Sequence, residues 1–260
     1  MNNNTLELLN KRDLEKSYLI LYVIPNKIYL KEASNYVNER VVYVMFGCNL
    51  YGERKYISTM LEKEVEKTSE WYNFFQDLKK RKLEHIIFGL LPDVKELRDG
   101  IKLSFPNIEI FNSSDKIIEK LKKYKTYKTK EEIFKEVKRL YLAEDEKAYE
   151  LNYKNFVDKY GKYTFIMDML EEEIKKLKGD YKYSLSVRKA VYSFNYIIEL
   201  KKRLSIYSYE KTFSNKEEYI KLYVNYIHAS ERQKHFKNDE WSEIINDIYE
   251  AKKEMIKPYI

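Results

Sequence analysis

The sequence of 260 residues contains few residues that crosslink the chain, break helices or bind transition metals. It has one cysteine, three histidines, six glycines and four prolines. Because Cys48 has no partner within the chain, no internal disulfide can form, and a reducing cytoplasm is the expected location. The scarcity of glycine and proline argues against long structureless loops, and a hydrophobic content of 44% is enough for a sizeable core.

Long apolar runs are also absent from the sequence. No run approaches the length of a membrane span, and the Asn-rich segment from Met1 to Leu9 lacks the basic-then-apolar pattern of a signal peptide. We therefore expect a folded cytoplasmic protein that does not interact with a membrane.

Several common catalytic signatures are missing as well. The sequence has no glycine-rich phosphate loop and no serine nucleophile elbow. His228 and His235 are spaced to share a helix face, but neither they nor His85 have a nearby third ligand, so no zinc site is predicted. Cys48 ends a predicted strand without a neighbouring histidine, which favours a core position over a role as nucleophile.

The chain does contain many charged residues and tyrosines. Lys and Arg total 49 against 42 Asp and Glu, which gives a formal net charge of +7, and there are 26 tyrosines. A mild basic excess is compatible with a nucleic-acid or acidic partner, although a solvated lysine-rich surface explains it equally well. The tyrosines are interpreted as boundary residues with an apolar ring and a solvated hydroxyl.

Short runs rich in β-branched and aromatic residues alternate with turn residues in the first quarter of the chain. They predict four strands, Tyr18–Ile24, Lys27–Lys31, Val41–Gly47 and Lys55–Leu61. Pro25-Asn26 and the stretch from Asn49 to Gly52 are typical of hairpin turns. An antiparallel meander is therefore expected here.

The pattern then changes to alternating helices and strands. Ser69–Lys82 and Val94–Phe105 have the apolar spacing of helices, whereas His85–Leu91 and Ile108–Phe111 are expected to be strands. Strand-helix-strand units place the later strands parallel and buried. From Asp115 onward the chain is predicted to be helical, with breaks at Lys125–Lys130, Gly161, Gly179-Asp180 and Phe213-Ser214-Asn215. The predicted fold class is α/β, with a mixed sheet.

A series of short segments occurs in order along most of the chain. They are Ile28-Tyr29-Leu30, Val41-Val42-Tyr43-Val44, Gly52-Glu53-Arg54, Ser69-Glu70-Trp71, Phe105-Pro106, Lys159-Tyr160-Gly161-Lys162-Tyr163, Arg188-Lys189-Ala190-Val191-Tyr192 before Asn195, and Trp241. In this order and spacing, from about Tyr22 to about Tyr249, the chain resembles the catalytic domain of mutator-type transposases of bacterial insertion sequences. The resemblance implies a ribonuclease H-like core formed by residues 18–114 and 185–260. It also implies an N-terminal extension (1–17), a large helical insertion (115–184) and C-terminal helices.

The chemistry implied by the resemblance is metal-assisted phosphoryl transfer, in which three carboxylates hold two Mg²⁺ ions. Such ions require anionic oxygen ligands at about 2.0–2.1 Å. The resemblance places the first aspartate at Asn26, the second aspartate at Pro92 and the glutamate at Ile198. None of these residues is acidic, so no catalytic residue and no metal site is expected.

Two nearby acids are the fallback ligands. A single-residue deletion would align Asp93 with the second position, and Glu199 follows Ile198. One step along a helix rotates a side chain by about 100°, however, which turns Glu199 away from the metal-facing side. No acidic residue occurs from Lys16 to Lys31, so realignment cannot supply the first ligand. The family's Cys and His pair after the Phe-Pro turn is missing too, and few residues precede the first strand, where the family's DNA-recognition region would lie.

Two basic clusters are candidates for contact with DNA. The more basic one combines lysines with Tyr124 and Tyr127, a combination suited to phosphate contact and base packing: Lys120, Lys122, Lys123, Lys125 and Lys128. The other consists of Lys201, Lys202 and Arg203, just beyond Ile198, and the resemblance implies that this neighbourhood faces DNA. A solvated helix end and loop is the alternative interpretation of the first cluster, and the second cluster is the better candidate for contact with nucleic acid.

The sequence thus predicts a transposase-derived protein without the metal-binding triad, acting as a DNA-associated, regulatory or assembly factor. No cofactor is expected, and the expected partners are DNA, a second copy of the chain or another chain. One alternative is an active Mg²⁺-dependent nuclease or transposase with a shifted acidic site that contains Asp93 and Glu199. The other is a protein-interaction scaffold that does not bind DNA.

Overall fold

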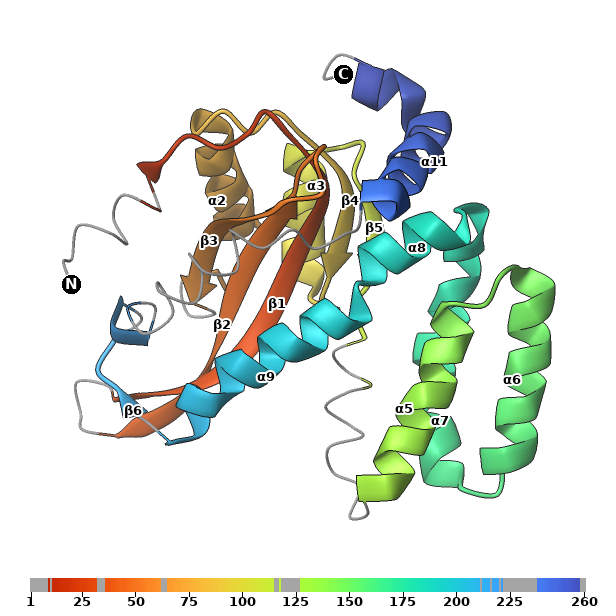
Figure 1. The fold of residues 1–260 in the computed structure, drawn as a ribbon. Helices are drawn as coiled ribbons and strands as arrows, with labels where there is room; N and C mark the ends of the chain where they lie inside the picture. The colour runs from red at the N-terminus through yellow and green to blue at the C-terminus, as the bar shows by residue number, and fades with distance from the viewer. Residues whose placement is uncertain are drawn as a thin grey trace.

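A computed structural model of the protein describes residues 9, 11–31, 36–61, 65–114, 117, 127–210, 212–215, 217–219, 221 and 238–257. In this part of the chain, six strands form one mixed sheet with the order β3-β2-β1-β4-β5, and β6 pairs with the far end of β1 (Figure 1). The strands are β1 (Ser17–Lys31), β2 (Val37–Cys48), β3 (Arg54–Leu61), β4 (His85–Leu91), β5 (Glu109–Asn112) and β6 (Thr212–Phe213).

The sheet changes direction at β1. Strands β1, β2 and β3 form an antiparallel meander, and the turn from Asn49 to Gly52 joins β2 to β3. Gly52 takes a positive φ of 76°, which suits glycine in this tight turn. Strands β4 and β5 run parallel to β1. The predicted mixed sheet, a meander followed by parallel strands, is confirmed.

The turn predicted at Pro25-Asn26 is wrong, because both residues lie inside the continuous strand β1. On one edge they pair with Tyr43 and Val42 of β2. On the other edge, the pairing with β4 ends at Tyr22 and the pairing with β6 begins at Tyr29. Proline is tolerated where one edge of a strand has no strand partner, because no ladder hydrogen bond is lost there.

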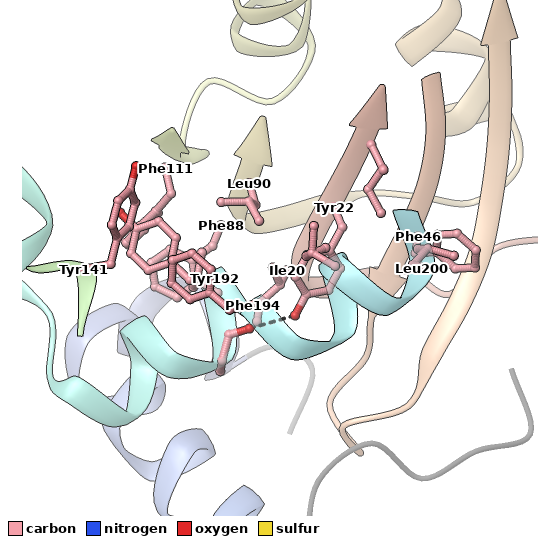
Figure 2. Packing of buried hydrophobic residues seen from close by; sticks show 14 of the residues in the cluster. Ile20, Tyr22, Phe46, Phe88, Leu90, Phe111, Tyr141, Tyr192, Phe194 and Leu200 are labelled. Atoms are coloured by element: carbon pink, nitrogen blue, oxygen red, sulfur yellow. Dashed lines mark hydrogen bonds between the residues drawn. The ribbon is translucent and has the colours of Figure 1, made fainter. Parts of the chain in front are cut away.

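Helices cover both faces of the sheet (Figure 1). On one face, Leu21 and Val23 of β1 share a core with α2 (Thr68–Lys80) and α3 (Lys95–Ser104). On the other face, Tyr22 and Ile24 share a core with α8 (Leu185–Tyr192) and α9 (Phe194–Glu210). Figure 2 shows Ile20 and Tyr22 of β1 and Phe88 and Leu90 of β4 in this second core. Because successive side chains of a strand point to opposite faces, β1 is buried on both sides.

The remaining helices lie beside the sheet. Figure 1 shows α5, α6 and α7 grouped together, with α11 next to α8; their bounds are α5 (Tyr127–Tyr141), α6 (Glu146–Tyr160), α7 (Thr164–Lys175) and α11 (Asn238–Ile256). The break predicted at Gly161 is confirmed, and Phe213 to Asn215 form the end of β6 and a bend. The break predicted at Lys125–Lys130 is wrong from Tyr127 onward, where α5 has begun. Gly179 and Asp180 lie within a 3₁₀ helix, η2 (Lys176–Lys182), instead of interrupting the helical structure.

One buried arginine fixes α8 to the helical group. The Arg188 guanidinium donates hydrogen bonds to the backbone carbonyls of four residues: Tyr141, Ala143, Glu144 and Tyr183. Arg188 is only 1% exposed, so these carbonyls replace its hydration. The residue therefore ties the α5–α6 connection and the end of η2 to the helix that leads into α9.

Candidate functional site

The first of the three implied ligand positions is Asn26, inside β1. Asn26 is buried, and its amide Nδ2 donates a hydrogen bond of 2.9 Å to the Tyr219 hydroxyl. An uncharged amide with its nitrogen turned toward a phenol offers one weak neutral oxygen where a divalent ion requires an anion.

The second position lies directly after β4, where Pro92 follows Leu91. The neighbouring acid, Asp93, is already engaged with two cations. Its carboxylate lies 3.4 Å from an Arg98 nitrogen and 3.2 Å from Lys176 Nζ. Lys176 Nζ also lies 3.1 Å from the buried carboxylate of Glu173, so one ammonium group bridges two acids. Burial lowers the pKa of Lys176, but the hydrogen bonds to Glu173 and Asp93 outweigh it and raise the pKa overall.

The third position is Ile198 on α9, and its side chain is exposed, as is that of Glu199. The Glu199 carboxylate accepts a hydrogen bond from Arg203, one turn further along the same helix. Both fallback acids, Asp93 and Glu199, thus have cationic partners from this chain. Within the described ranges, no group of three or more His, Cys, Asp or Glu side chains is arranged to hold a metal ion.

The side chains at the three positions are an amide, a pyrrolidine ring and a hydrocarbon. A two-metal centre requires several anionic oxygens around each ion, with surrounding hydrogen-bonding groups that orient them. Asn26, Pro92 and Ile198 do not fit such a centre.

The comparison with protein families decides the identity. A family model described as Transposase, Mutator family matches residues 2–238. The chain belongs to this transposase family. No curated protein matches the chain. The family match includes Asn26, Pro92 and Ile198, so the non-acidic side chains occur inside the region shared with other mutator transposases.

The environment of the basic cluster beyond Ile198 differs from residue to residue. Lys201 is half-buried, and desolvation lowers its pKa to about 7, well below the usual value for lysine. Arg203 is paired with Glu199, and Lys202 is exposed on α9. Contact of Lys201, Lys202 and Arg203 with DNA stays a prediction.

The other basic cluster falls largely beyond the part of the chain that the structure describes. Lys120, Lys122, Lys123 and Lys125 lie outside the described residues, and Lys128 lies in α5 with a side chain that is not described. His228 and His235 are also outside the described residues. Cys48 is buried in the core, as predicted, and burial raises the pKa of its thiol to about 12.

Sequence reasoning missed a pocket where α8 meets α9. It is lined by residues from five elements, among them Arg54, Lys138, Lys189, Asn195 and Glu240. These residues are far apart along the chain, and only folding brings them together. Arg54, Lys189 and Asn195 do occur in the segments that carry the family resemblance, but their positions along the sequence do not indicate that they face one cavity.

Among the described residues, no helix combines the length and the apolar character needed to cross a bilayer.

Proposed function

We propose that this transposase-family protein does not cleave DNA strands and acts as a DNA-associated regulatory or assembly factor. The observation that carries the proposal is the set of side chains at the implied ligand positions, Asn26, Pro92 and Ile198. Two divalent ions at these positions would lack the anionic oxygens that hold them, and without the ions the charge on the transferring phosphate would not be neutralised.

Asp93 and Glu199 are poorly placed to supply the missing anionic ligands, because both are already paired with cations. To bind a metal ion, Asp93 would have to leave Arg98 and Lys176, and Lys176 would retain only Glu173 as an acidic partner. Glu199 would likewise have to leave Arg203. Losing these ion pairs opposes metal binding at both places, which argues against the alternative of a shifted acidic site.

Association with DNA is supported by family membership and by charge. Transposases act on DNA, and the chain carries a formal net charge of +7. Positive charge attracts the phosphate backbone irrespective of base sequence, through release of condensed counterions. Lys202, exposed on α9 next to the position of the missing glutamate, is the proposed contact from the described part of the chain.

Cleavage is tested with supercoiled plasmid in the presence of Mg²⁺ or Mn²⁺. We expect no conversion to nicked or linear forms beyond that of a metal-free control. Metal-dependent cleavage that disappears in Asp93→Ala, and persists in the exposed-site control Asp158→Ala, would establish the shifted acidic site and refute the proposal.

DNA association is tested by measuring the affinity for a 5′-hydroxyl duplex as a function of salt. We expect affinity to fall linearly on logarithmic axes as salt rises, and Lys202→Ala to reduce the slope by about 1. Lys154→Ala, an exposed lysine on α6, is the matched control. Absence of binding at low ionic strength would remove the DNA part of the proposal. If, in addition, the protein had the mass of a dimer in solution and Lys202→Ala behaved like the parent, the interaction scaffold would be favoured.

A further inference from the structure

A pocket of about 380 Å³ lies at the joint between α8 and α9. This volume is within the range of small-molecule sites, about 300–1,000 Å³. Its lining includes three cationic side chains from three elements: Arg54 at the start of β3, Lys138 of α5 and Lys189 of α8. The only acidic side chain among the residues that line this pocket is Glu240 of α11.

Two of the cations are held in place by the protein. Arg54 is 3% exposed, its guanidinium lies 3.9 Å from the centre of the Tyr196 ring, and it donates a hydrogen bond of 2.8 Å to Ser193 Oγ. Lys138 Nζ donates a hydrogen bond of 3.1 Å to the Asn195 side-chain oxygen. Lys189 also lines the pocket, and its side chain is exposed. An anion that binds here would meet charges that are already ordered, which lowers the entropic cost of binding.

The backbone adds further positive potential. Helix α9 is 17 residues long and begins in this pocket with Phe194 and Asn195. The first hydrogen bond along the helix runs from Ile197 N to Ser193 O, so the amide groups of Phe194 and Asn195 precede it. The Ser193 hydroxyl donates to Ala190 O and accepts from Arg54, and its oxygen also lies 3.2 Å from the Tyr22 hydroxyl. A helix N-terminus favours an anion.

We propose that this pocket binds a phosphomonoester, the terminal phosphate of a nucleotide or of a nucleic-acid strand. Three cations and one carboxylate leave a net charge of +2 in the pocket. A phosphomonoester carries about −1.5 to −2 at pH 7 and matches this charge, whereas an internal phosphodiester carries a single negative charge. This site is independent of duplex binding, so it goes beyond the function proposed above.

The test is calorimetric titration of the full chain at low ionic strength with four probes. These are thymidine 5′-monophosphate, thymidine, and one thymidine oligonucleotide with either a 5′-phosphate or a 5′-hydroxyl end. We expect both phosphorylated probes to bind more tightly than their unphosphorylated partners. Tighter binding of the mononucleotide would identify a small ligand, and tighter binding of the 5′-phosphorylated oligonucleotide would identify a strand terminus; both outcomes support the site.

Variants locate the binding in this pocket. Lys189→Ala should weaken binding of thymidine 5′-monophosphate about tenfold, which corresponds to about 1.4 kcal/mol. Glu240→Gln should tighten it several-fold, and Lys154→Ala on α6 should leave it unchanged. All three side chains are exposed, so the fold should be retained, and circular dichroism checks this.

Equal affinity for thymidine and its monophosphate would overturn the proposal, as would unchanged binding by Lys189→Ala or an equal loss in Lys154→Ala. The 5′-hydroxyl duplex, which has no terminal phosphate, reports separately on the function proposed above. Absence of duplex binding alone would remove the DNA part of that proposal and leave the pocket standing.

Discussion

Asn26 donates a hydrogen bond to Tyr219 from a buried position on β1, so replacing it with the carboxylate that the resemblance implies at this position is informative. We expect Asn26→Asp to lower the free energy of unfolding at pH 7 by about 1–3 kcal/mol, because a carboxylate is desolvated there. Burial would raise the folded-state pKa of the introduced carboxyl above its unfolded value of about 3.9. The penalty should therefore shrink as pH falls through that folded-state pKa. Urea unfolding of the parent and of Asn26→Asp at several pH values measures this penalty.

The same variant tests whether one restored acid recreates a metal site. With Pro92 and Ile198 unchanged, Mg²⁺ should not raise the melting temperature of Asn26→Asp, and plasmid should stay uncut. Asn26→Leu is the control for loss of the hydrogen bond without a charge. A rise of several degrees with Mg²⁺ that is absent in Asn26→Leu would show that other ligands lie within reach.

Asp180 in η2 is a carboxyl group whose buried environment disfavours its charged form. Desolvation raises its pKa to about 6, against the opposing effects of a hydrogen bond from Tyr192 and of nearby Lys182 and Arg188. The folded state binds the Asp180 proton more tightly than the unfolded chain does. The contribution of this proton to the free energy of unfolding is therefore fully present below about pH 4 and is lost as pH rises through 6. A shift of this size corresponds to about 2–3 kcal/mol.

We expect Asp180→Asn to remove this part of the pH dependence. The asparagine oxygen can still accept from Tyr192, so the variant should be more stable than the parent by about 1–2 kcal/mol at pH 7.5 and equal to it near pH 4. Asp158→Asn, at an exposed position on α6, is the control and should not change the profile. If Asp180→Asn changed the free energy of unfolding by the same amount at every pH, the Asp180 carboxyl would not be desolvated as inferred.

At the scale of secondary-structure elements, Arg188 determines how α8 and α9 are attached to the helical group. We expect Arg188→Lys to lower the free energy of unfolding by about 3 kcal/mol or more. A lysine has three donors without the planar arrangement of the guanidinium, and it leaves buried carbonyls without partners. The matched control is Arg139→Lys on the exposed side of α5. Equal unfolding midpoints for the two variants in urea would contradict the structural role.

The elements themselves were largely predictable from sequence, because apolar periodicity reports which face of a segment is buried. The helix containing Trp71 and Phe75 and the strand from His85 to Leu91 are examples. Pro25 was misread because proline signals a turn unless the strand has an unpaired edge, and strand pairing is not visible in sequence. The separation of α8 from α9 at Ser193, which takes a φ of 38°, had no local signal either.

Some features of the candidate site could likewise be predicted from the sequence, and others could not. The assignment of Asn26, Pro92 and Ile198 to the implied ligand positions rests on the resemblance alone, through the motifs that neighbour them. The ion pairs of Asp93 with Arg98 and Lys176, and the pocket around Arg54, depend on contacts between elements distant in sequence. Desolvation of Lys201 depends on tertiary burial as well. Such properties follow from packing and have no periodic signature.

At the scale of the whole molecule, Glu109 of β5 joins the edge of the sheet to two helical segments. Its carboxylate lies 2.7 Å from Lys252 Nζ of α11 and 3.1 Å from Lys182 Nζ of η2. Burial raises the pKa of Glu109, but the two lysines outweigh it and lower the pKa to about 2. Trp241 Nε1 adds a hydrogen bond of 2.8 Å from α11 to Leu50 O. These contacts hold the C-terminal helix against the sheet.

We expect Glu109→Gln to reduce the free energy of unfolding at pH 7 by about 1 kcal/mol, a value discounted because the carboxylate is one-third exposed. Because the pKa of Glu109 is lower in the folded state, its carboxylate stabilises the fold above the unfolded-state pKa of about 4.3. The difference in stability between the parent and Glu109→Gln should therefore vanish as pH falls from 4 toward 2. Hydrogen exchange should increase in α11 more than in β1, because α11 loses its ion pair with the edge of the sheet. Glu171→Gln, which breaks an exposed pair within α7, should change neither. Increased exchange spread uniformly over the sheet would show that Glu109 supports the core and not the attachment of α11.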